Sequence, residues 1–275
     1  MRDFILAANW KMHKSPREAV QFFRDFVPAL ESKLKLAPLA ESGGAPRVAR
    51  GFGQGPNKGA RRVLFFVPAL NVFASEQAVR GSGLELGIQN IHSEAKGAFT
   101  GENSPVVASE MGVSWALVGH SERRALFSET DAQTGLKMQA ALVHGLSAMI
   151  CVGETLAERE AGITMTVVER QLDAALTGIA ETLRATPDRV AVAYEPVWAI
   201  GTGKVATPEQ ASSVHQSIRQ WLVGKFGAET AGLISILYGG SVKSDNAAAI
   251  AAQPEIDGFL VGGASLEPQS FLGLI

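Results

Sequence analysis

Eight short apolar segments, separated by amphipathic stretches, are the feature that most limits what this chain can fold into. Their nearly unbroken apolar character is typical of parallel strands that are covered on both faces. A length of 275 residues suits one large α/β domain. The expected strands lie at 4–9, 63–67, 84–89, 115–119, 148–152, 190–195, 234–239 and 258–262.

Several of the intervening segments begin with the signature of a helix N-terminus. A Ser or Thr N-cap followed three residues later by Glu or Gln forms a capping box, and proline fits the first helical position. Two of these helices are expected to end near Gly145 and Gly227. The starts are Ser15-Pro16-Arg17-Glu18, Thr130 to Gln133, and Thr207-Pro208-Glu209-Gln210.

Strands that each precede a helix predict a closed (β/α)8 barrel, a single domain over residues 1–275. The alternative is an open, doubly wound sheet. That alternative is disfavoured because "NWKMHKS", and not a glycine-rich phosphate-binding turn, follows the first strand.

Residues 37–62, "APLAESGGAPRVARGFGQGPNKGARR", fit neither the strand nor the helix period. The segment joins the first helix to the second strand, so a barrel places it on the N-terminal face, away from the active site. We interpret it as an insertion, and a basic contact surface remains the alternative. Its charged residues are Arg47, Arg50, Lys58, Arg61, Arg62 and a single acid, Glu41.

The composition argues against several classes of protein. A net charge of −2 gives no indication of nucleic-acid or membrane-surface binding. No window is long enough to span a bilayer, and the apolar run in "MRDFILAANWKMHK" is too short for a signal peptide. The single cysteine, Cys151, cannot form an intrachain disulfide. We therefore expect a cytoplasmic protein.

Polar residues lie at or just after the C-terminal ends of three of the expected strands, where barrels build their active sites. Asn9 and Lys11 follow the first strand, and Lys11 is a candidate cation for an anionic substrate or else a solvated loop lysine. His120 follows the fourth strand, and Ser121 is expected to cap the helical turn beginning at Glu122. The helix N-terminus opposes protonation, so His120 is expected to be a neutral hydrogen-bond donor unless it only satisfies neighbouring backbone.

Glu195 ends the sixth strand in "AVAYEPVWAIGTGK". Burial in an apolar setting disfavours the charged form and raises the basicity of a carboxylate, as a general base requires. The alternative is a structural glutamate in an ion pair, for which Lys204 is the one local partner in this segment.

Two glycine pairs, in "YGGSV" and "LVGGAS", follow the last two strands, where barrels frequently bind phosphate. No metal-ligand spacing and no recognisable nucleophile motif occur in the sequence. The remaining chemistry is proton abstraction next to a carbonyl on a small phosphorylated substrate.

Together these motifs resemble those of the triosephosphate isomerase family, in the family's order and over nearly the whole chain outside 37–62. The resemblance implies a TIM barrel that interconverts dihydroxyacetone phosphate and D-glyceraldehyde 3-phosphate through an enediolate, in glycolysis and gluconeogenesis, with no cofactor and no metal. The matching motifs are "NWKM", "QN", "GAFTGE", "GHSERR", "AYEPVWAIGTGK", "YGGSV" and "LVGGASL".

The resemblance also implies a role for each site residue. Glu195 is then the base, and His120 is the neutral electrophile that polarises the carbonyl and moves protons between the enediolate oxygens. Lys11 is the active-site cation, Asn9 helps to bind the oxyanion, and Glu122 fixes Lys11 or a neighbouring loop. The backbone N–H groups that hold the phosphate belong to Gly201, Ser241, Gly262 and Gly263.

Two loops have implied roles as well. A mobile lid excludes water from the enediolate, and it comprises Pro196, Val197, Trp198, Ala199, Ile200, Gly201, Thr202, Gly203 and Lys204. The loop 91–102 docks into a second subunit near Asn9 and Lys11, with Thr100 at the contact, so a homodimer is expected. Asn103 stands where the family pattern is usually aliphatic, and Ala69 where it usually has a second proline.

Two other functions remain alternatives. One is a different phosphate-binding barrel enzyme with a larger sugar-phosphate substrate. The other is an inactive barrel that acts as a scaffold through its basic insertion. The scaffold hypothesis predicts damage at Glu195, His120 or Lys11, and all three are intact.

Overall fold

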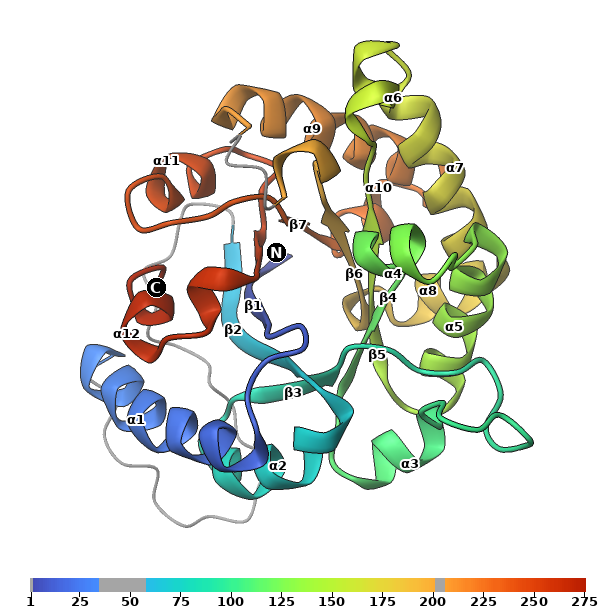
Figure 1. Cartoon of the computed structure of the whole chain (residues 1–275). Helices are drawn as coiled ribbons and strands as arrows, with labels where there is room; N and C mark the ends of the chain where they lie inside the picture. Colours follow the sequence, from blue (N-terminus) through green and yellow to red (C-terminus); the bar gives the residue numbers. More distant parts are fainter. Residues whose placement is uncertain (1, 35–57, 201–205) are drawn as a thin grey trace.

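The computed structural model describes residues 2–34, 58–200 and 206–275. Within them, eight strands close into a barrel in chain order, because β1 pairs in parallel with both β2 and β8 (Figure 1). The closed barrel is confirmed, and the open sheet is excluded. The strands are β1 (Arg2–Asn9), β2 (Lys58–Val67), β3 (Glu85–Ile88), β4 (Trp115–Val118), β5 (Ser147–Val152), β6 (Val190–Tyr194), β7 (Ser235–Tyr238) and β8 (Gly258–Val261).

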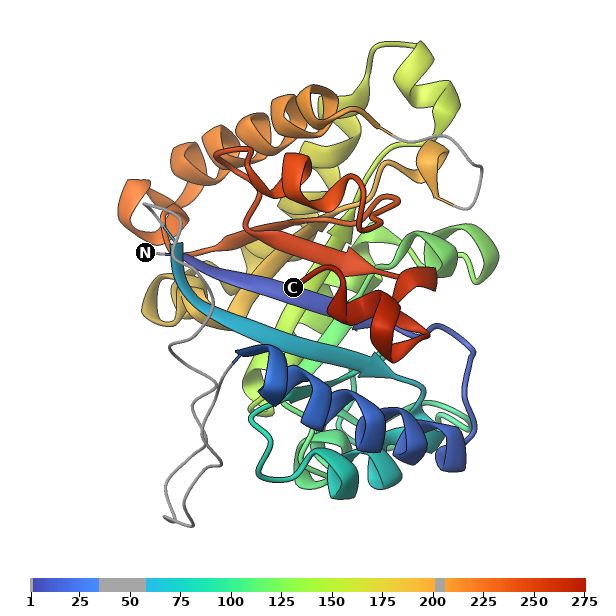
Figure 2. The same cartoon turned by 90° about the vertical axis from the view of Figure 1, so that its left-hand side faces the viewer.

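Helices surround the barrel and run back along its outside, as Figure 2 shows for α1 beside β2. None of the described helices is long and apolar enough to cross a membrane. The helices are α1 (Pro16–Leu34), α2 (Val72–Val79), α3 (Pro105–Glu110), α4 (Ser121–Leu126), α5 (Asp131–Val143), α6 (Leu156–Glu160), α7 (Thr164–Leu176), α8 (Ala180–Ala185), α9 (Pro208–Phe226), α10 (Ala228–Ala231), α11 (Ala247–Ala251) and α12 (Pro268–Leu272).

The predicted helix starts form as expected. Thr130 and Thr207 each make a complete capping box, with Gln133 and Gln210. Thr155 and Glu158 form a further capping box at the start of α6, which was not predicted from the sequence. The helices α5 and α9 stop just before glycines with positive φ, Gly145 (86°) and Gly227 (84°), as the sequence predicts.

Strand β2 begins at Lys58, earlier than the expected position 63, so the last residues of the segment 37–62 belong to the barrel. Charged residues hid this strand from a reading based on apolar runs. Arg62 pairs with Ile5 of β1, and its guanidinium donates to both carboxylate oxygens of Glu85 at 2.7 and 2.6 Å. The rest of the predicted insertion, residues 37–57, lies outside the described residues, and its role stays a prediction.

The core has two layers because successive side chains of a strand point to opposite faces. Between barrel and helices, a packed aromatic group has ring centroids 5.0–5.7 Å apart; it contains Trp10, Phe22, Phe23, Phe26, Phe65 and Phe271. The barrel interior is a separate apolar cluster of Ile5, Ala7, Leu64, Phe66, Trp115, Leu117, Met149, Cys151, Ala191, Ala193, Leu237 and Leu260. Large side chains there face small ones: a Cβ at Gly87 would lie 2.3 Å from the Phe66 ring.

Buried charges tie α9 to the N-terminal rim of the barrel. Asp257, just before β8, binds Arg2 of β1 and Arg219 of α9, each at 2.9 Å. Arg219 also bonds to Glu255 at 2.9 Å. These partners compensate each other's burial, so the rim opposite the predicted active site is held by ionic contacts.

His215 of α9 is fully buried beside this network, and among the described residues its ring has one hydrogen-bond partner, the carbonyl of Glu255 at 3.0 Å from Nδ1. A carbonyl only accepts, so Nδ1 carries the proton of a neutral ring and Nε2 is left without a partner. Burial lowers the pKa of His215 to about 4, with the Arg219 charge acting in the same direction.

Acid should therefore weaken the fold through His215. Its folded pKa lies below the ordinary value of 6.5, so the unfolded chain binds the proton first as the pH falls from 6.5 toward 4. We expect this residue to remove about 3 kcal/mol of unfolding free energy over that window. Urea unfolding at pH 7, 5.5 and 4 measures this loss. The free energy of unfolding should fall less with acid in His215→Asn than in wild type, and the control His144→Asn should behave as wild type.

Candidate active site

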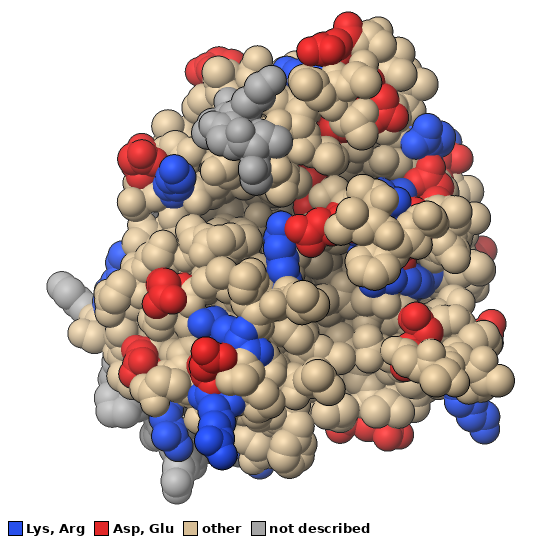
Figure 3. Space-filling model, viewed as in Figure 1, with Lys and Arg blue, Asp and Glu red and all other residues tan. Residues whose placement is uncertain are grey.

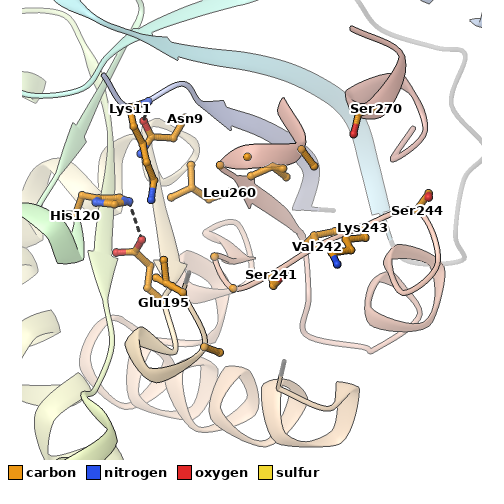
Figure 4. A pocket seen from close by; sticks show the side chains of 18 residues that line it. Asn9, Lys11, His120, Glu195, Ser241, Val242, Lys243, Ser244, Leu260 and Ser270 are labelled. Carbon is orange, nitrogen blue, oxygen red and sulfur yellow. Dashed lines mark hydrogen bonds and ion pairs between the residues drawn. The ribbon is translucent and has the colours of Figure 1, made fainter. Parts of the chain in front are cut away.

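A cavity of about 640 Å³ opens at the C-terminal rim of the barrel. Figure 3 shows a hollow near the centre of this face, with basic and acidic side chains together at its edge. The cavity brings together residues that follow β1, β4, β6, β7 and β8 (Figure 4). Of the residues predicted from the sequence, those that line it are Asn9, Lys11, His120, Glu195, Ala199, Ile200, Ser241, Gly262 and Gly263.

Glu195 directly follows β6, and each of its two carboxylate oxygens has a defined polar neighbour. Only 2% of the residue is exposed. Oε1 lies 3.0 Å from Nε2 of His120, and Oε2 accepts a hydrogen bond of 2.9 Å from the backbone N–H of Ser121. The carboxylate is therefore aimed at the histidine across the mouth of the barrel, as Figure 4 shows.

These contacts correct the expectation that burial makes Glu195 a stronger base. Burial does raise the pKa of its carboxyl group. The His120 charge and hydrogen bond, the Ser121 N–H and the Lys11 charge outweigh burial, so the pKa is lowered from 4.5. In this arrangement the partners stabilise the carboxylate, because each of them interacts better with the charged form.

His120 is the N-cap of α4, a role that the sequence reading gave to Ser121. Its Nδ1 accepts a hydrogen bond of 3.2 Å from the backbone N–H of Glu122, so the ring proton lies on Nε2, facing Glu195. Burial lowers the pKa of His120. The Glu195 carboxylate raises this pKa by its charge and its hydrogen bond, and these effects prevail, so the net shift is upward. The α4 backbone thus fixes a neutral tautomer, while the neighbouring carboxylate favours the cation.

Lys11 projects into the cavity from a constrained turn. Its backbone is left-handed, with φ of 51°, and its N–H donates to Oδ1 of Asn9 at 3.0 Å. Its Nζ lies 2.5 Å from Oε1 of Glu122, which holds the ammonium group in place. A Cβ at Gly262 would come within 3.5 Å of the Lys11 side chain, so the cation lies beside the glycine pair after β8.

The glycine pair after β7 has a steric role that the sequence reading missed. A Cβ at Gly239 would lie 2.9 Å from Cγ of Glu195, and one at Gly240 only 2.2 Å from the Tyr238 hydroxyl. A larger residue at position 239 would therefore require the Glu195 side chain or its surroundings to shift. After β8 the situation differs, since a Cβ at Gly263 would meet nothing within 4 Å.

Cys151 of β5 also interacts with Glu195, and the sequence analysis used this cysteine only to exclude disulfides. Burial and the neighbouring Glu195 carboxylate raise the pKa of its thiol well above 9.0. It therefore stays a neutral thiol beside the carboxylate. The alternation of inward residues along β5 was the available signal, because it turns Cys151 toward the barrel interior.

The comparisons with known proteins give one consistent result. The family model for triosephosphate isomerase matches residues 40–275. The triosephosphate isomerases of Solibacter usitatus and Carboxydothermus hydrogenoformans are 43% and 45% identical to this chain, covering all of it and 99% and 98% of their own lengths. That of Bdellovibrio bacteriovorus is 45% identical over 97% of this chain.

The chain belongs to the triosephosphate isomerase family. This resemblance, first read from short motifs, extends over the full length of the relatives. It excludes the alternative of a different phosphate-binding barrel family.

The lid that the triosephosphate isomerase resemblance implies is described as far as Ile200. A short 3-10 helix, Val197–Ala199, follows Pro196. The indole N–H of Trp198 donates to the carboxylate of Glu154 at 3.1 Å, and so does the hydroxyl of Tyr194 at 3.0 Å. Trp198, in the described part of this predicted lid, is thus held by a buried carboxylate. The remaining lid residues, Gly201, Thr202, Gly203 and Lys204, lie outside the described residues.

The loop that the triosephosphate isomerase resemblance assigns to dimer contact projects from the body between β3 and α3 (Figure 1). Its tip is exposed, Thr100 included. At its base, Asn103 donates from Nδ2 to the carbonyl of Asn90 and accepts at its own carbonyl from the N–H of His92. The polar residue at this usually aliphatic position thus closes the base of the loop.

The hydrogen bond from Ser121 to Glu195 gives a direct test of the electrostatics. Ser121→Pro removes this donor, while proline suits the first residue of a helix and the extended ψ of 140° at His120 suits a following proline. Because the charged form loses a partner, the pKa of Glu195 should rise. Carboxyl ¹³C NMR titration should show a higher midpoint for the signal that Glu195→Gln deletes. An unchanged midpoint would contradict this account.

Proposed function

We propose that Glu195, His120 and Lys11 interconvert dihydroxyacetone phosphate and D-glyceraldehyde 3-phosphate in this chain. The reaction is that of triosephosphate isomerases, the family to which the chain belongs. One observation carries the assignment of residues: a buried carboxylate lies 3.0 Å from the Nε2 of a histidine at the mouth of the barrel. A base and a hydrogen-bond donor at this distance can act on adjacent atoms of one small substrate.

The proton transfers balance without an oxidant or reductant. Glu195 removes a proton from the carbon next to the carbonyl, the C–H electrons form a C=C bond, and the carbonyl oxygen takes the charge. His120 donates from Nε2 to that oxygen and moves a proton between the two enediolate oxygens. Glu195 then returns its proton to the neighbouring carbon, which completes the exchange of ketose for aldose.

The other residues that line the cavity suit the phosphate and the oxyanion. Backbone N–H groups of Gly201, Ser241, Gly262 and Gly263 would bind phosphate oxygens, since glycine allows close approach of the backbone. Lys11 adds a fixed positive charge beside Gly262. Oδ1 of Asn9 is occupied by the N–H of Lys11, which leaves its Nδ2 amide to donate to the oxyanion.

The lid, Pro196–Lys204, would cover the bound substrate. Ala199 and Ile200 already contribute apolar surface to the cavity. Excluding water strengthens each electrostatic contact with the enediolate and suppresses loss of its phosphate. The contact of Trp198 with Glu154 supports a hinge at this end of the lid.

The position of the base can be tested by shortening its side chain. Glu195→Asp withdraws the carboxylate by one methylene, and kcat should fall by about a hundredfold or more, because the transfer depends on placement. A coupled assay of glyceraldehyde 3-phosphate conversion measures the effect. Glu160→Asp, in the exposed turn of α6, serves as the control and should keep wild-type kcat. Wild type without turnover would refute the proposed function itself.

We also propose that the chain works as a cytoplasmic homodimer. A second cavity, of about 410 Å³, lies where the exposed residue Met12 and the loop residues Gly101 and Glu102 meet Lys11 and His120. Two exposed apolar side chains, Met12 and Phe127, line it, which suits a protein partner. The loop 91–102 of a second copy, with Thr100 at its tip, would cover this region and support Asn9 and Lys11.

A charge at the loop tip should separate the subunits. Thr100→Arg forces a guanidinium into the proposed contact, so sedimentation should show monomer at concentrations where wild type is a dimer. We expect kcat to fall at least tenfold in the monomer, because Lys11 loses its support. Thr182→Arg, exposed on α8, should leave both properties unchanged. A wild type that sediments as a monomer would contradict the homodimer.

A further inference from the structure

The backbone of the catalytic glutamate lies on a short stretch of chain that follows β5. The N–H of Glu195 donates to the carbonyl of Val152 at 2.7 Å, and the N–H of Val197 donates to the carbonyl of Glu154 at 3.2 Å. Gly153 lies between these two contacts. A Cβ there would come within 1.7 Å of the Glu195 carbonyl oxygen, so the two backbones touch directly.

One side chain from outside the barrel holds Gly153. Gln171, on α7, is 4% exposed. Its Oε1 accepts from the N–H of Gly153 at 2.8 Å, and its Nε2 donates to the carbonyl of Gly153 at 3.2 Å. Since the glycine offers one donor and one acceptor, only this orientation of the amide satisfies both groups.

In the part of the chain that the structure describes, no other side chain fills the space next to this pair of hydrogen bonds. A cavity of about 460 Å³ reaches both Gly153 and Gln171, and Glu195, Cys151 and Val197 also line it. Close packing on this side therefore does not keep Gly153 in place. The two hydrogen bonds from Gln171 are the contacts that fix it to α7.

We propose that Gln171 is a positioning residue for the catalytic base. It fixes Gly153, Gly153 abuts the backbone of Glu195, and the carboxylate is thereby kept within hydrogen-bond distance of His120. The inference rests on the proposed role of Glu195 as the base. Gln171 does not touch the cavity that would bind the substrate, so its effect should fall on proton transfer rather than on binding.

Gln171→Met tests this role, because methionine has similar length but makes neither hydrogen bond. We expect kcat to fall by about tenfold to a hundredfold, as for a displacement approaching 1 Å, with KM within about threefold of wild type. A slower proton transfer should also raise the primary isotope effect on kcat with substrate deuterated at the transferred position. Gln171→Glu keeps the shape but loses the donor to Gly153, and it decides the question if Gln171→Met does not fold.

Leu172→Ala is the matched control. Leu172 is the next residue on α7 and packs in the outer core, so its truncation destabilises the protein without touching Gly153. It should lower the thermal midpoint and leave kcat and the isotope effect unchanged. The positioning role would be overturned if folded Gln171 variants kept the wild-type kcat and isotope effect. It would also be overturned if Leu172→Ala lost as much kcat as the Gln171 variants. Absence of turnover in wild type would instead overturn the proposed function.

Discussion

Burial of the Glu195 carboxylate constrains which groups can surround it at the C-terminal rim of the barrel. An almost completely buried charge is tolerated only where hydrogen bonds and an opposite charge compensate for the lost solvation. Here the compensation comes from the histidine and the first N–H of α4, two groups that also fit the proposed chemistry. Both groups face the carboxylate because His120 is the N-cap of α4, and Gly239 leaves room for the Glu195 side chain, since a Cβ there would lie 2.9 Å from its Cγ.

The two ends of the barrel perform different tasks. At the N-terminal rim, Asp257 binds two arginines and connects β1, β8 and α9. At the other rim, loops from five strands meet around a cavity. The interior apolar cluster separates the two ends. Because ionic contacts at one end do not share residues with the site at the other, the loops at the C-terminal rim are free to carry polar groups.

Much of this architecture could be predicted from sequence because apolar period and capping chemistry are local properties. All eight strands and the boxes at Thr130 and Thr207 follow from a few neighbouring residues. The start of β2 was misplaced because its compensation is not local: Arg62 is tolerated in a strand through Glu85, 23 positions away. The predicted direction of the pKa shift of Glu195 was wrong for the same reason, since the partners of its carboxylate lie 74 and 75 positions earlier in the chain.

The contact between Gly153 and Glu195 limits how this chemistry could be moved to another protein. A designer who grafts a glutamate, a histidine and a lysine onto a new barrel transfers functional groups but not the neighbouring main chain on which the glutamate lies. The donor barrel provides that main chain through a residue with no side chain at all. A catalytic template for this site should therefore include backbone atoms of residues 152–154, and a scaffold with any Cβ at the central position should be rejected before its side chains are considered.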